Sequence, residues 1–323
     1  MKITISSSDE LTRIDNFLSK RLNEFSRSKI QKLIKESSIT VNDRIVNKNF
    51  KLSSGDIIQI DDNSLYLKKE NKKLKEWDFP LEVIFKDKDF AIINKPLGII
   101  SHPSSTNNTK TLVNILLKKF KKELASHPDP IRPGIVHRLD RDTTGVMIIP
   151  FNEYSHWKIA DQFKNRTIQK KYIALTWGEW NVDKGIIENK LLRNKKNPLK
   201  FQSSKEGRLA TSKFKLISKG KYFSSINFFP KTGRTHQIRV HCSENGFPIV
   251  GDELYGGGLN KLNEYSSEVR KKLIPLFTEH GGHFLHAAEI SFLHPVSNER
   301  IVFKSKPSKS FQSVLKLIKD DEI

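Results

Sequence analysis

Apolar and polar residues alternate along two short segments in the first sixty residues, as they do in strands that bury one face. These segments are ITVNDRIV (39–46) and KLSSGDIIQI (51–60), and each contains a turn signal, Asn-Asp or Gly-Asp. The segment before them, FSRSKIQKLIKESS (25–38), instead spaces its apolar residues as a short helix does, at Ile30, Leu33 and Ile34. We therefore expect a compact helix-plus-hairpin module at this end of the chain.

Beyond residue 80, apolar segments of both kinds follow one another without strict alternation of strands and helices. The patterns predict strands over residues 81–95, 145–151, 167–177 and 222–230. They predict helices over residues 111–123, 152–164 and 236–245. Strict alternation would indicate a doubly wound parallel sheet, so this order favours an α+β fold with a mainly antiparallel, mixed sheet and helices packed against it.

A highly charged stretch separates the two patterns. Residues 68–80, KKENKKLKEWDFP, have too little apolar periodicity to form a packed element and too much charge to be buried. We therefore predict an N-terminal domain over residues 1–67, a solvated linker over residues 68–80 and a larger domain over residues 81–323.

The charge balance indicates the kind of partner. The chain has 57 lysine and arginine residues against 36 acidic residues, a formal net charge of +21. Such an excess predicts attraction to a polyanion, with nucleic acid favoured over an anionic membrane. No apolar run approaches the ~20 residues that a membrane span needs, and the first residues lack the apolar core of a signal peptide, so we expect a cytoplasmic protein.

Several kinds of cofactor chemistry find no support in the sequence. A single cysteine, Cys242, excludes an internal disulfide framework and a cysteine-built zinc finger. The glycine-rich stretch 251–260 lacks the spacing of a phosphate-binding loop. The Gly-Gly pair in EHGGHFLHAAE argues against a helical zinc site at the three histidines His280, His283 and His286. We therefore expect neither a metal site nor nucleotide-driven chemistry.

One polar segment stands between two apolar ones, in GIVHRLDRDTTGVMII (134–149). Asp140 follows an apolar lead-in and precedes a predicted strand, so we expect its carboxylate at the edge of a water-poor cleft. There it can act as a nucleophile or general base if an arginine, such as Arg138 or Arg239, offsets its charge. The alternative is a structural salt-bridge cluster, which gathers the same residue types.

Two further segments carry candidate binding residues. KTGRTHQIRVH (231–241) lies near a predicted helix start, where an anion is favoured, and contains Arg234, His236, Arg239 and His241. A basic helix face is the alternative for that segment. In KKYIALTWG (170–178), strand alternation allows Tyr172 to face a cleft and stack on a base, although an aromatic residue in a strand is more often part of the core.

Together these segments resemble the RluA-type pseudouridine synthases that carry an N-terminal S4 RNA-binding domain, the ribosomal large-subunit branch of that family. The segments RIDNFLSKRL, SRSKIQKLIKE and ITVND resemble the S4 domain. Six further segments resemble successive motifs of the family's catalytic domain: DFAIINKPLGIISHP, RPGIVHRLDRDTTG, FKNRTIQKKYIAL, TGRTHQIRVH, PIVGDELYGG and FLHAAEISFLHP. Several independent motifs in the right order, over nearly the whole chain, make this resemblance specific.

The resemblance implies roles for particular residues. Asp140 corresponds to the family's catalytic aspartate, Arg239 to the arginine that forms an ion pair with it, and Tyr172 to the tyrosine that stacks on the flipped uracil. Arg138 would fill the gap that the extruded base leaves. We also expect RNA contacts from further basic residues, namely Arg234 and, on the polar side of the predicted S4 helix, Arg27, Lys29, Lys32 and Lys35. An ordinary solvated helix face is the alternative for the lysines.

The implied function is isomerisation of specific uridines, foremost in large-subunit ribosomal RNA, by a monomeric enzyme without cofactor or membrane partner. A uridine is flipped out, its N1–C1′ bond is broken, the uracil turns, and C5 joins C1′. Asp140 could attack C1′, stabilise an oxocarbenium-like state or abstract the 2′ proton, and the sequence favours none of these routes. Two other functions stay open: an RNA-binding assembly factor without activity, and a hydrolase that cleaves the bond without rejoining.

Overall fold

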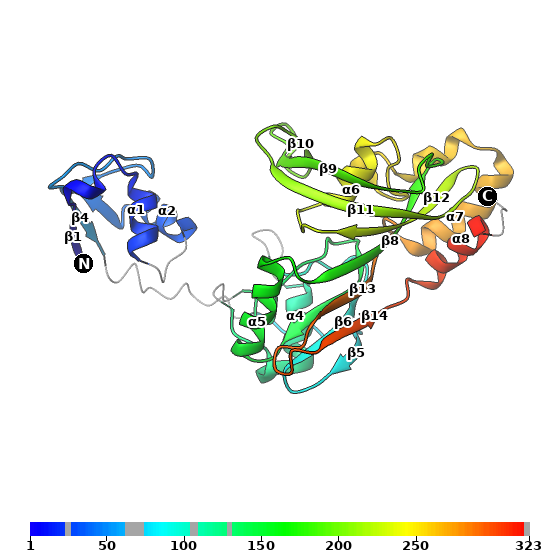
Figure 1. The fold of residues 1–323 in the computed structure, drawn as a ribbon, viewed down its shortest axis with the longest axis horizontal. Helices are drawn as coiled ribbons and strands as arrows, with labels where there is room; N and C mark the ends of the chain where they lie inside the picture. The colour runs from blue at the N-terminus through cyan, green and yellow to red at the C-terminus, as the bar shows by residue number, and fades with distance from the viewer. Residues whose placement is uncertain (23–26, 62–73, 104–108, 128–130, 320–323) are drawn as a thin grey trace. The chain divides into compact units, whose positions relative to one another are not determined.

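The computed structural model describes residues 1–22, 27–61, 74–103, 109–127 and 131–319, with only the backbone of residues 28, 29, 32 and 122. The chain divides into two compact units, Met1–Lys73 and Leu74–Ile323 (Figure 1). Each unit buries apolar side chains of its own, so each has its own core. Within the described residues, no helix is both long enough and apolar enough to cross a bilayer.

In its described residues, the smaller unit contains a four-stranded antiparallel sheet and two α-helices. In the order β1-β4-β2-β3, its strands are β1 (Lys2–Thr4), β4 (Ile57–Ile60), β2 (Ile39–Val41) and β3 (Arg44–Ile45). Its helices are α1 (Ile14–Arg21) and α2 (Arg27–Lys35). The predicted helix and hairpin strands are confirmed. β1 was not predicted, because three strand residues are too few to reveal an alternation. α1 was also not predicted, although Ile14, Phe17 and Leu18 have the spacing of a helix.

A buried carboxylate connects the two helices of the smaller unit. Asp15 on α1 accepts hydrogen bonds from Arg27 on α2, at 2.9 and 3.1 Å, and from Gln31, at 2.6 Å. Arg13 donates two more, at 3.0 and 3.1 Å. Burial opposes ionisation, but the hydrogen bonds from Arg13, Gln31 and Arg27 prevail and lower the pKa of Asp15 to about 2.

The larger unit is built on a 10-stranded mixed sheet in the order β10-β9-β11-β12-β8-β13-β7-β6-β5, with β14 beside β13. Its strands are β5 (Glu82–Lys86), β6 (Phe90–Lys95), β7 (Thr144–Pro150), β8 (Gln169–Trp177), β9 (Lys184–Arg193), β10 (Phe201–Ser203), β11 (Arg208–Lys219), β12 (Phe223–Pro230), β13 (Leu285–Leu293) and β14 (Arg300–Lys304). Neighbours are antiparallel except β13 and β7, which run parallel. The predicted α+β class is confirmed.

Helices cover the sheet of the larger unit. They are α4 (Leu112–Phe120), α5 (Glu153–Lys164), α6 (Gln237–Glu244), α7 (Ser267–His280) and α8 (Lys309–Lys319), with short 3-10 helices η3 (Glu253–Tyr255) and η4 (Leu259–Glu264) between α6 and α7. The single strand predicted over residues 81–95 is wrong, because β5 and β6 form a hairpin there. Its turn is fixed by Asp87, whose Oδ1 accepts the N–H groups of Asp89 and Phe90 at 2.7 and 2.8 Å.

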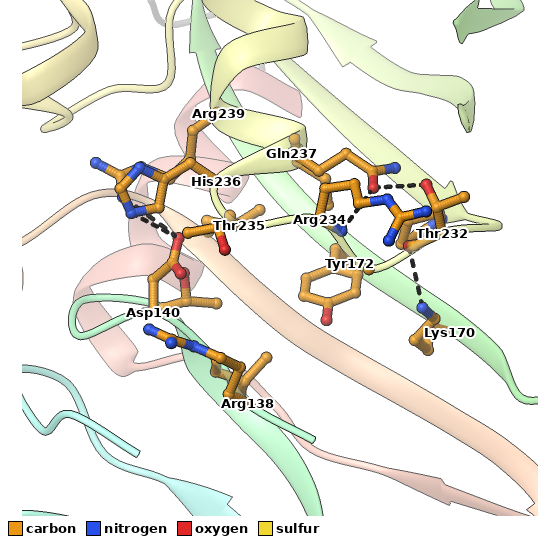
Figure 2. Close-up of a pocket in the computed structure, with 16 residues that line it drawn as sticks. Arg138, Asp140, Lys170, Tyr172, Thr232, Arg234, Thr235, His236, Gln237 and Arg239 are labelled. Carbon is orange, nitrogen blue, oxygen red and sulfur yellow. Dashed lines mark hydrogen bonds and ion pairs between the residues drawn. The ribbon is translucent and has the colours of Figure 1, made fainter. Parts of the chain in front are cut away.

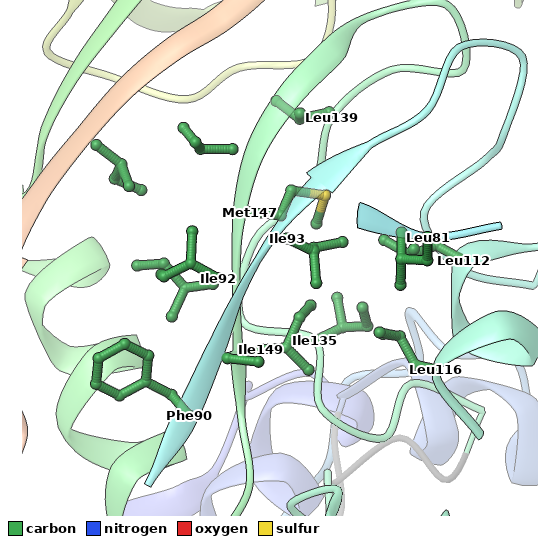
Figure 3. Close-up of a cluster of buried hydrophobic side chains, with 14 of the residues drawn as sticks. Leu81, Phe90, Ile92, Ile93, Leu112, Leu116, Ile135, Leu139, Met147 and Ile149 are labelled. Carbon is green, nitrogen blue, oxygen red and sulfur yellow. The ribbon is translucent and has the colours of Figure 1, made fainter. Parts of the chain in front are cut away.

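Apolar residues of β6, β7 and α4 form the core beneath the loop that precedes β7 (Figure 3). Leu139, within that loop, is buried in the same cluster. Gly145, near the start of β7, has a φ of +118°, and a Cβ there would lie 2.2 Å from the carbonyl oxygen of Ala287 on β13. Only glycine permits this close approach, so the parallel pairing of β7 with β13 depends on it.

The solvated linker predicted over residues 68–80 is wrong in its second half. Trp77 and Phe79 pack against the core of the larger unit, with ring centroids 4.8 Å apart. The N–H of Trp77 also donates to the carbonyl of Asn114 on α4 at 3.0 Å. Three apolar residues among charged ones, Leu74, Trp77 and Phe79, attach this segment to the larger unit. Residues 68–73 of the predicted linker lie outside the described residues.

Candidate active site

A pocket of about 100 Å³ lies where three segments of the larger unit meet. The loop before β7 contributes Asp140, β8 contributes Tyr172, and the start of α6 contributes His236 and Arg239 (Figure 2). The side chain of Asp140 is 16% exposed. Its carboxylate therefore faces the pocket while bulk water has little access to it.

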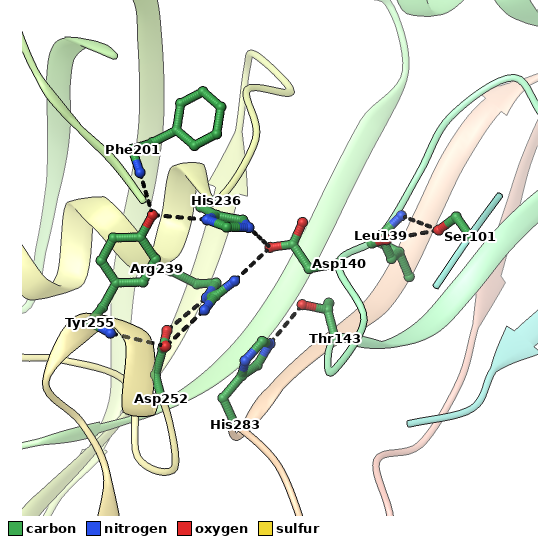
Figure 4. Close-up of polar contacts among 10 residues, drawn as sticks. All are labelled: Ser101, Leu139, Asp140, Thr143, Phe201, His236, Arg239, Asp252, Tyr255 and His283. Carbon is green, nitrogen blue, oxygen red and sulfur yellow. Dashed lines mark hydrogen bonds and ion pairs between the residues drawn. The ribbon is translucent and has the colours of Figure 1, made fainter. Parts of the chain in front are cut away.

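Arg239 forms an ion pair with Asp140, with 3.3 Å between Nη1 and Oδ2. The other nitrogens of this buried guanidinium bind Asp252 more closely, Nε at 2.7 Å and Nη2 at 2.8 Å (Figure 4). Burial opposes the charge of Arg239, but Asp252 and then Asp140 outweigh it and raise the pKa of Arg239 above its usual value. One guanidinium is thus shared between two carboxylates.

Asp252, which the sequence analysis did not single out, determines where Arg239 points. It is 1% exposed and also accepts the N–H of Tyr255 at 3.3 Å. The Tyr255 ring lies 4.9 Å from the guanidinium of Arg239, and its hydroxyl bonds Nδ1 of His236 at 2.8 Å. The same hydroxyl accepts the N–H of Phe201 at 2.8 Å. In the sequence, Asp252 could have been noticed as the first acidic residue of PIVGDELYGG, in a glycine-rich turn after a short apolar run.

Tyr172 lines the same pocket as Asp140 (Figure 2). It is partly buried, because its ring also packs against two apolar clusters of the larger unit. Burial, and then the charge of Asp140, raise the pKa of Tyr172 well above its usual value, so its hydroxyl stays protonated. The side chain thus offers a neutral aromatic surface to the pocket, and its core contacts hold the ring in place.

Hydrogen bonds hold the loop that carries Asp140. Ser101 Oγ donates to the carbonyl of Leu139 at 2.7 Å and accepts its N–H at 3.2 Å (Figure 4). His137 Nε2 accepts the N–H of Ile148 on β7 at 2.9 Å. Since both neighbours of Arg138 are anchored, the backbone beside Asp140 has little freedom to move.

Lys95 ties the same loop to the end of β6. Its Nζ donates to the carbonyl of Arg141 at 2.9 Å and to that of Pro96 at 2.7 Å. The side chain is fully buried. Burial lowers the pKa of Lys95 to about 7, although the charges of Asp142 and Asp140 oppose this shift. Lys95 lies in the Asn-Lys-Pro segment, where no local sequence pattern indicates this role.

Comparison with known proteins identifies the family. A family model described as RNA pseudouridylate synthase matches residues 89–244, and an S4 domain model matches residues 12–58. An RNA pseudouridine synthase of Aquifex aeolicus, itself uncharacterised, is 36% identical over 311 residues, which cover 94% of this chain and 93% of that protein. This chain belongs to the RNA pseudouridine synthase family.

Further relatives and a solved structure support the same family assignment. The ribosomal large subunit pseudouridine synthase D of Borreliella burgdorferi is 36% identical over 269 residues, 80% of this chain and 82% of that protein. The solved structure of human RNA pseudouridylate synthase domain containing 4 has a TM-score of 0.57 at 24% identity, over 74% of this chain and 93% of that one, and shows a shared fold. The resemblance inferred from the motifs is confirmed for both the S4 domain and the synthase domain.

Two arginines predicted to bind RNA line the pocket of the synthase domain. Arg138 is exposed and precedes Asp140 by two residues. Arg234 is partly buried, and its Nε donates to the carbonyl of Leu209 at 3.0 Å. Burial, and then the charges of Arg166 and Arg208, lower the pKa of Arg234. Both arginines thus line the pocket that Asp140 faces.

The basic residues predicted on the S4 helix have different surroundings. Arg27 is half-exposed and forms an ion pair with the buried Asp15 at 2.9 Å, so part of its hydrogen-bonding capacity serves the S4 fold. Lys35 is exposed at the end of α2. The side chains of Lys29 and Lys32 lie outside those that the structure describes.

The three histidines considered for zinc have protein partners at separate points. His283 Nε2 bonds Thr143 Oγ1 at 2.9 Å, next to the loop of Asp140 (Figure 4). His286 Nδ1 bonds Thr144 Oγ1 at 2.8 Å, and His280 Nδ1 bonds a serine, Ser308, at 3.1 Å. Burial lowers the pKa of all three. They therefore serve as neutral hydrogen-bonding groups that join α7, β13 and the turn between them to neighbouring segments.

Proposed function

We propose that this RNA pseudouridine synthase isomerises specific uridines of large-subunit ribosomal RNA, with Asp140 as the catalytic carboxylate. Relatives from Borreliella burgdorferi, Buchnera aphidicola and Xanthomonas campestris are named ribosomal large subunit pseudouridine synthase D and are 31–36% identical. The S4 domain and the formal net charge of +21 support RNA as the partner. We propose in addition that the enzyme acts as a monomer.

The reaction balances within the substrate itself. The N1–C1′ bond of a flipped uridine breaks, the uracil turns within the pocket, and a C5–C1′ bond forms. The proton at C5 leaves and N1 receives a proton, so no oxidant, reductant or second substrate is needed. The pocket must therefore hold a detached base, and it must offer a group that can act at the sugar carbon.

Asp140 is the group that carries this proposal. Its carboxylate is 16% exposed in a pocket that it shares with Tyr172, and it lies 3.3 Å from Arg239. In this place it can attack C1′, stabilise positive charge that develops on the sugar, or remove the 2′ proton. Arg239 offsets the negative charge of the carboxylate while RNA displaces water from the pocket.

Tyr172 and Arg138 serve the flipped base in this proposal. The neutral ring of Tyr172 provides a surface on which uracil can stack and turn, since stacking needs no fixed hydrogen bond. Arg138 is exposed beside the pocket and is long enough to occupy the gap that the base leaves in the RNA. Arg234 on the pocket, and Arg27, Lys29, Lys32 and Lys35 of the S4 domain, would add phosphate contacts that weaken with salt.

Release of tritium from RNA labelled at C5 of uridine tests the proposal. The wild-type enzyme should release tritium from large-subunit RNA, and Asp140→Asn should release none while its Kd for RNA changes less than about threefold, because the amide keeps shape and removes charge. Asp142→Asn, the same change two residues away and outside the pocket lining, is the matched control and should retain activity. Turnover by Asp140→Asn, in a preparation without wild-type enzyme, would refute the role of Asp140.

The same assay separates the two other functions. An RNA-binding assembly factor would bind RNA but release no tritium even as wild type, whereas a hydrolase would leave free uracil among its products. Pseudouridine mapping of ribosomal RNA from cells with and without this gene would then identify the target uridines.

A further inference from the structure

A second pocket of about 370 Å³ adjoins the catalytic pocket, and we call it the basic pocket. The two pockets share part of their lining, including Arg138, Lys170, Tyr172 and Arg234. The Tyr172 ring therefore borders both spaces. Pockets that bind small ligands usually measure about 300–1,000 Å³, so the basic pocket has room for a nucleotide-sized group.

The floor of the basic pocket is uncharged. Phe163, at the end of α5, stacks on His137, with ring centroids 4.6 Å apart and an angle of 26° between the planes. His137 Nε2 accepts the N–H of Ile148, so the proton of the neutral ring sits on Nδ1. Burial, and then the charge of Lys170, lower the pKa of His137 to about 3, so the ring is neutral at physiological pH.

The rim of the basic pocket carries only positive charges. Six cations line it, namely Arg138, Lys164, Arg166, Lys170, Lys231 and Arg234, and no carboxylate does. Within the described part of the chain, none of the six forms an ion pair with an acidic side chain. Other lysines of this unit, such as Lys86 and Lys219, do have such partners. Lys170 is partly buried, and its Nζ donates to the carbonyl of Thr232 at 3.2 Å.

We propose that the basic pocket binds the RNA phosphodiester that adjoins the flipped uridine. This inference rests on the proposed function, because the flipped uridine occupies the neighbouring pocket across Tyr172. When a nucleotide leaves its stack, the adjoining phosphate moves with it, and a contiguous site must receive that phosphate. Even while Arg138 occupies the gap in the RNA, the other five cations attract a phosphate strongly without a competing carboxylate, and the uncharged floor accommodates the attached sugar.

Neutral linkages in the RNA test the proposal directly. The RNA is a large-subunit fragment that contains one mapped target uridine, and single methylphosphonates replace the phosphates up to three positions on either side. One linkage next to the target should raise Kd on the order of tenfold for Asp140→Asn, and KM similarly for wild type with kcat retained. Unchanged Kd at every flanking linkage would overturn the inference.

Variants assign the sensitive linkage to the basic pocket. Arg166→Gln and Lys164→Gln remove exposed charges from its rim, and Lys271→Gln, exposed on α7, removes one elsewhere as the matched control. Each rim variant should weaken binding severalfold and reduce the salt slope of log K by about 0.7, as the loss of one phosphate contact predicts for single strands. The control should do neither.

The combined effect of one protein substitution and one RNA substitution on binding shows whether the two act on the same contact. Arg166→Gln and the sensitive methylphosphonate should together weaken binding less than the product of their separate effects, because both remove one contact. Fully multiplicative effects would overturn the inference. Failure of the proposed function would appear differently, as absence of tritium release by the wild-type enzyme on unmodified RNA.

Discussion

Replacing Lys95 with methionine tests whether an ammonium group buried beside the loop that carries Asp140 lowers the stability of the synthase domain. Lys95 is fully buried and donates to two carbonyl groups, those of Pro96 and Arg141. Burial lowers its pKa to about 7, against the opposing charges of Asp142 and Asp140. Methionine has a similar length and no charge, so it removes the titration and leaves most of the packing.

The sign of the pH effect follows from the protons that each state binds. Below about pH 7 the lysine is protonated in both the folded and the unfolded chain, and the cost of burying the charge is fully present. Between about pH 7 and 10.5 the unfolded chain binds more protons, so the free energy of unfolding rises with pH. From pH 7 to pH 9 the rise amounts to about 2 kcal/mol.

Urea unfolding followed by tryptophan fluorescence measures this rise in the synthase domain alone. All four tryptophans of the chain, Trp77, Trp157, Trp177 and Trp180, lie in that domain. The difference in unfolding free energy between wild type and Lys95→Met should move by about 2 kcal/mol in favour of wild type from pH 7 to pH 9, because titrations of the other groups cancel. A difference that stays constant would refute the reasoning.

Asp252→Asn is expected to lower the unfolding free energy by about 2 kcal/mol and to lower kcat at least about tenfold, because Arg239 loses a charge-assisted hydrogen bond. If the variant turned over substrate as fast as wild type, Arg239 would need no support from Asp252. Tyr172→Phe should keep kcat within about threefold in the tritium assay, whereas Tyr172→Leu should lose it, and equal losses would instead implicate the hydroxyl. Hydrogen exchange should show that the unfolding free energy of the S4 domain includes a contribution from ionised Asp15. This contribution is fully present above about pH 4 and falls by about 1–2 kcal/mol toward pH 2 as Asp15 is protonated. Asp15→Asn should abolish this pH dependence.

Sequence patterns predicted the elements whose periodicity is local and strong. The helix expected over 236–245 is α6, and the strand expected over 167–177 is β8, each within two residues at either end. The antiparallel pair of β9 and β11 was not predicted, because the apolar residues of β9 come in adjacent pairs, Ile186-Ile187 and Leu191-Leu192, instead of alternating with polar ones. A strand of this kind is recognisable only by its partner.

Residues of the site could be predicted from the sequence where a family motif contains them. Residues that belong to the site only through contacts in the folded chain could not. Asp140, Tyr172 and Arg239 come together because β8 pairs with β12 and β13, which no local pattern reveals. Family motifs supplied these three residues. Asp252 and Lys95 act through other side chains or backbone groups, so their roles depend on distances that only the folded chain defines.

The unequal division of Arg239 between two carboxylates fits a reaction in which one of them must react. A guanidinium held bidentately by Asp140 would lose its strongest bonds whenever that carboxylate approached a sugar carbon, and the loss would add to the reaction barrier. Here the bonds of 2.7 and 2.8 Å go to Asp252, which is buried and away from the pocket lining, and Asp140 receives the longer contact of 3.3 Å. Asp140 can therefore leave Arg239 without unpairing a buried charge, while Arg239 stays in position to offset whatever negative charge remains on the carboxylate.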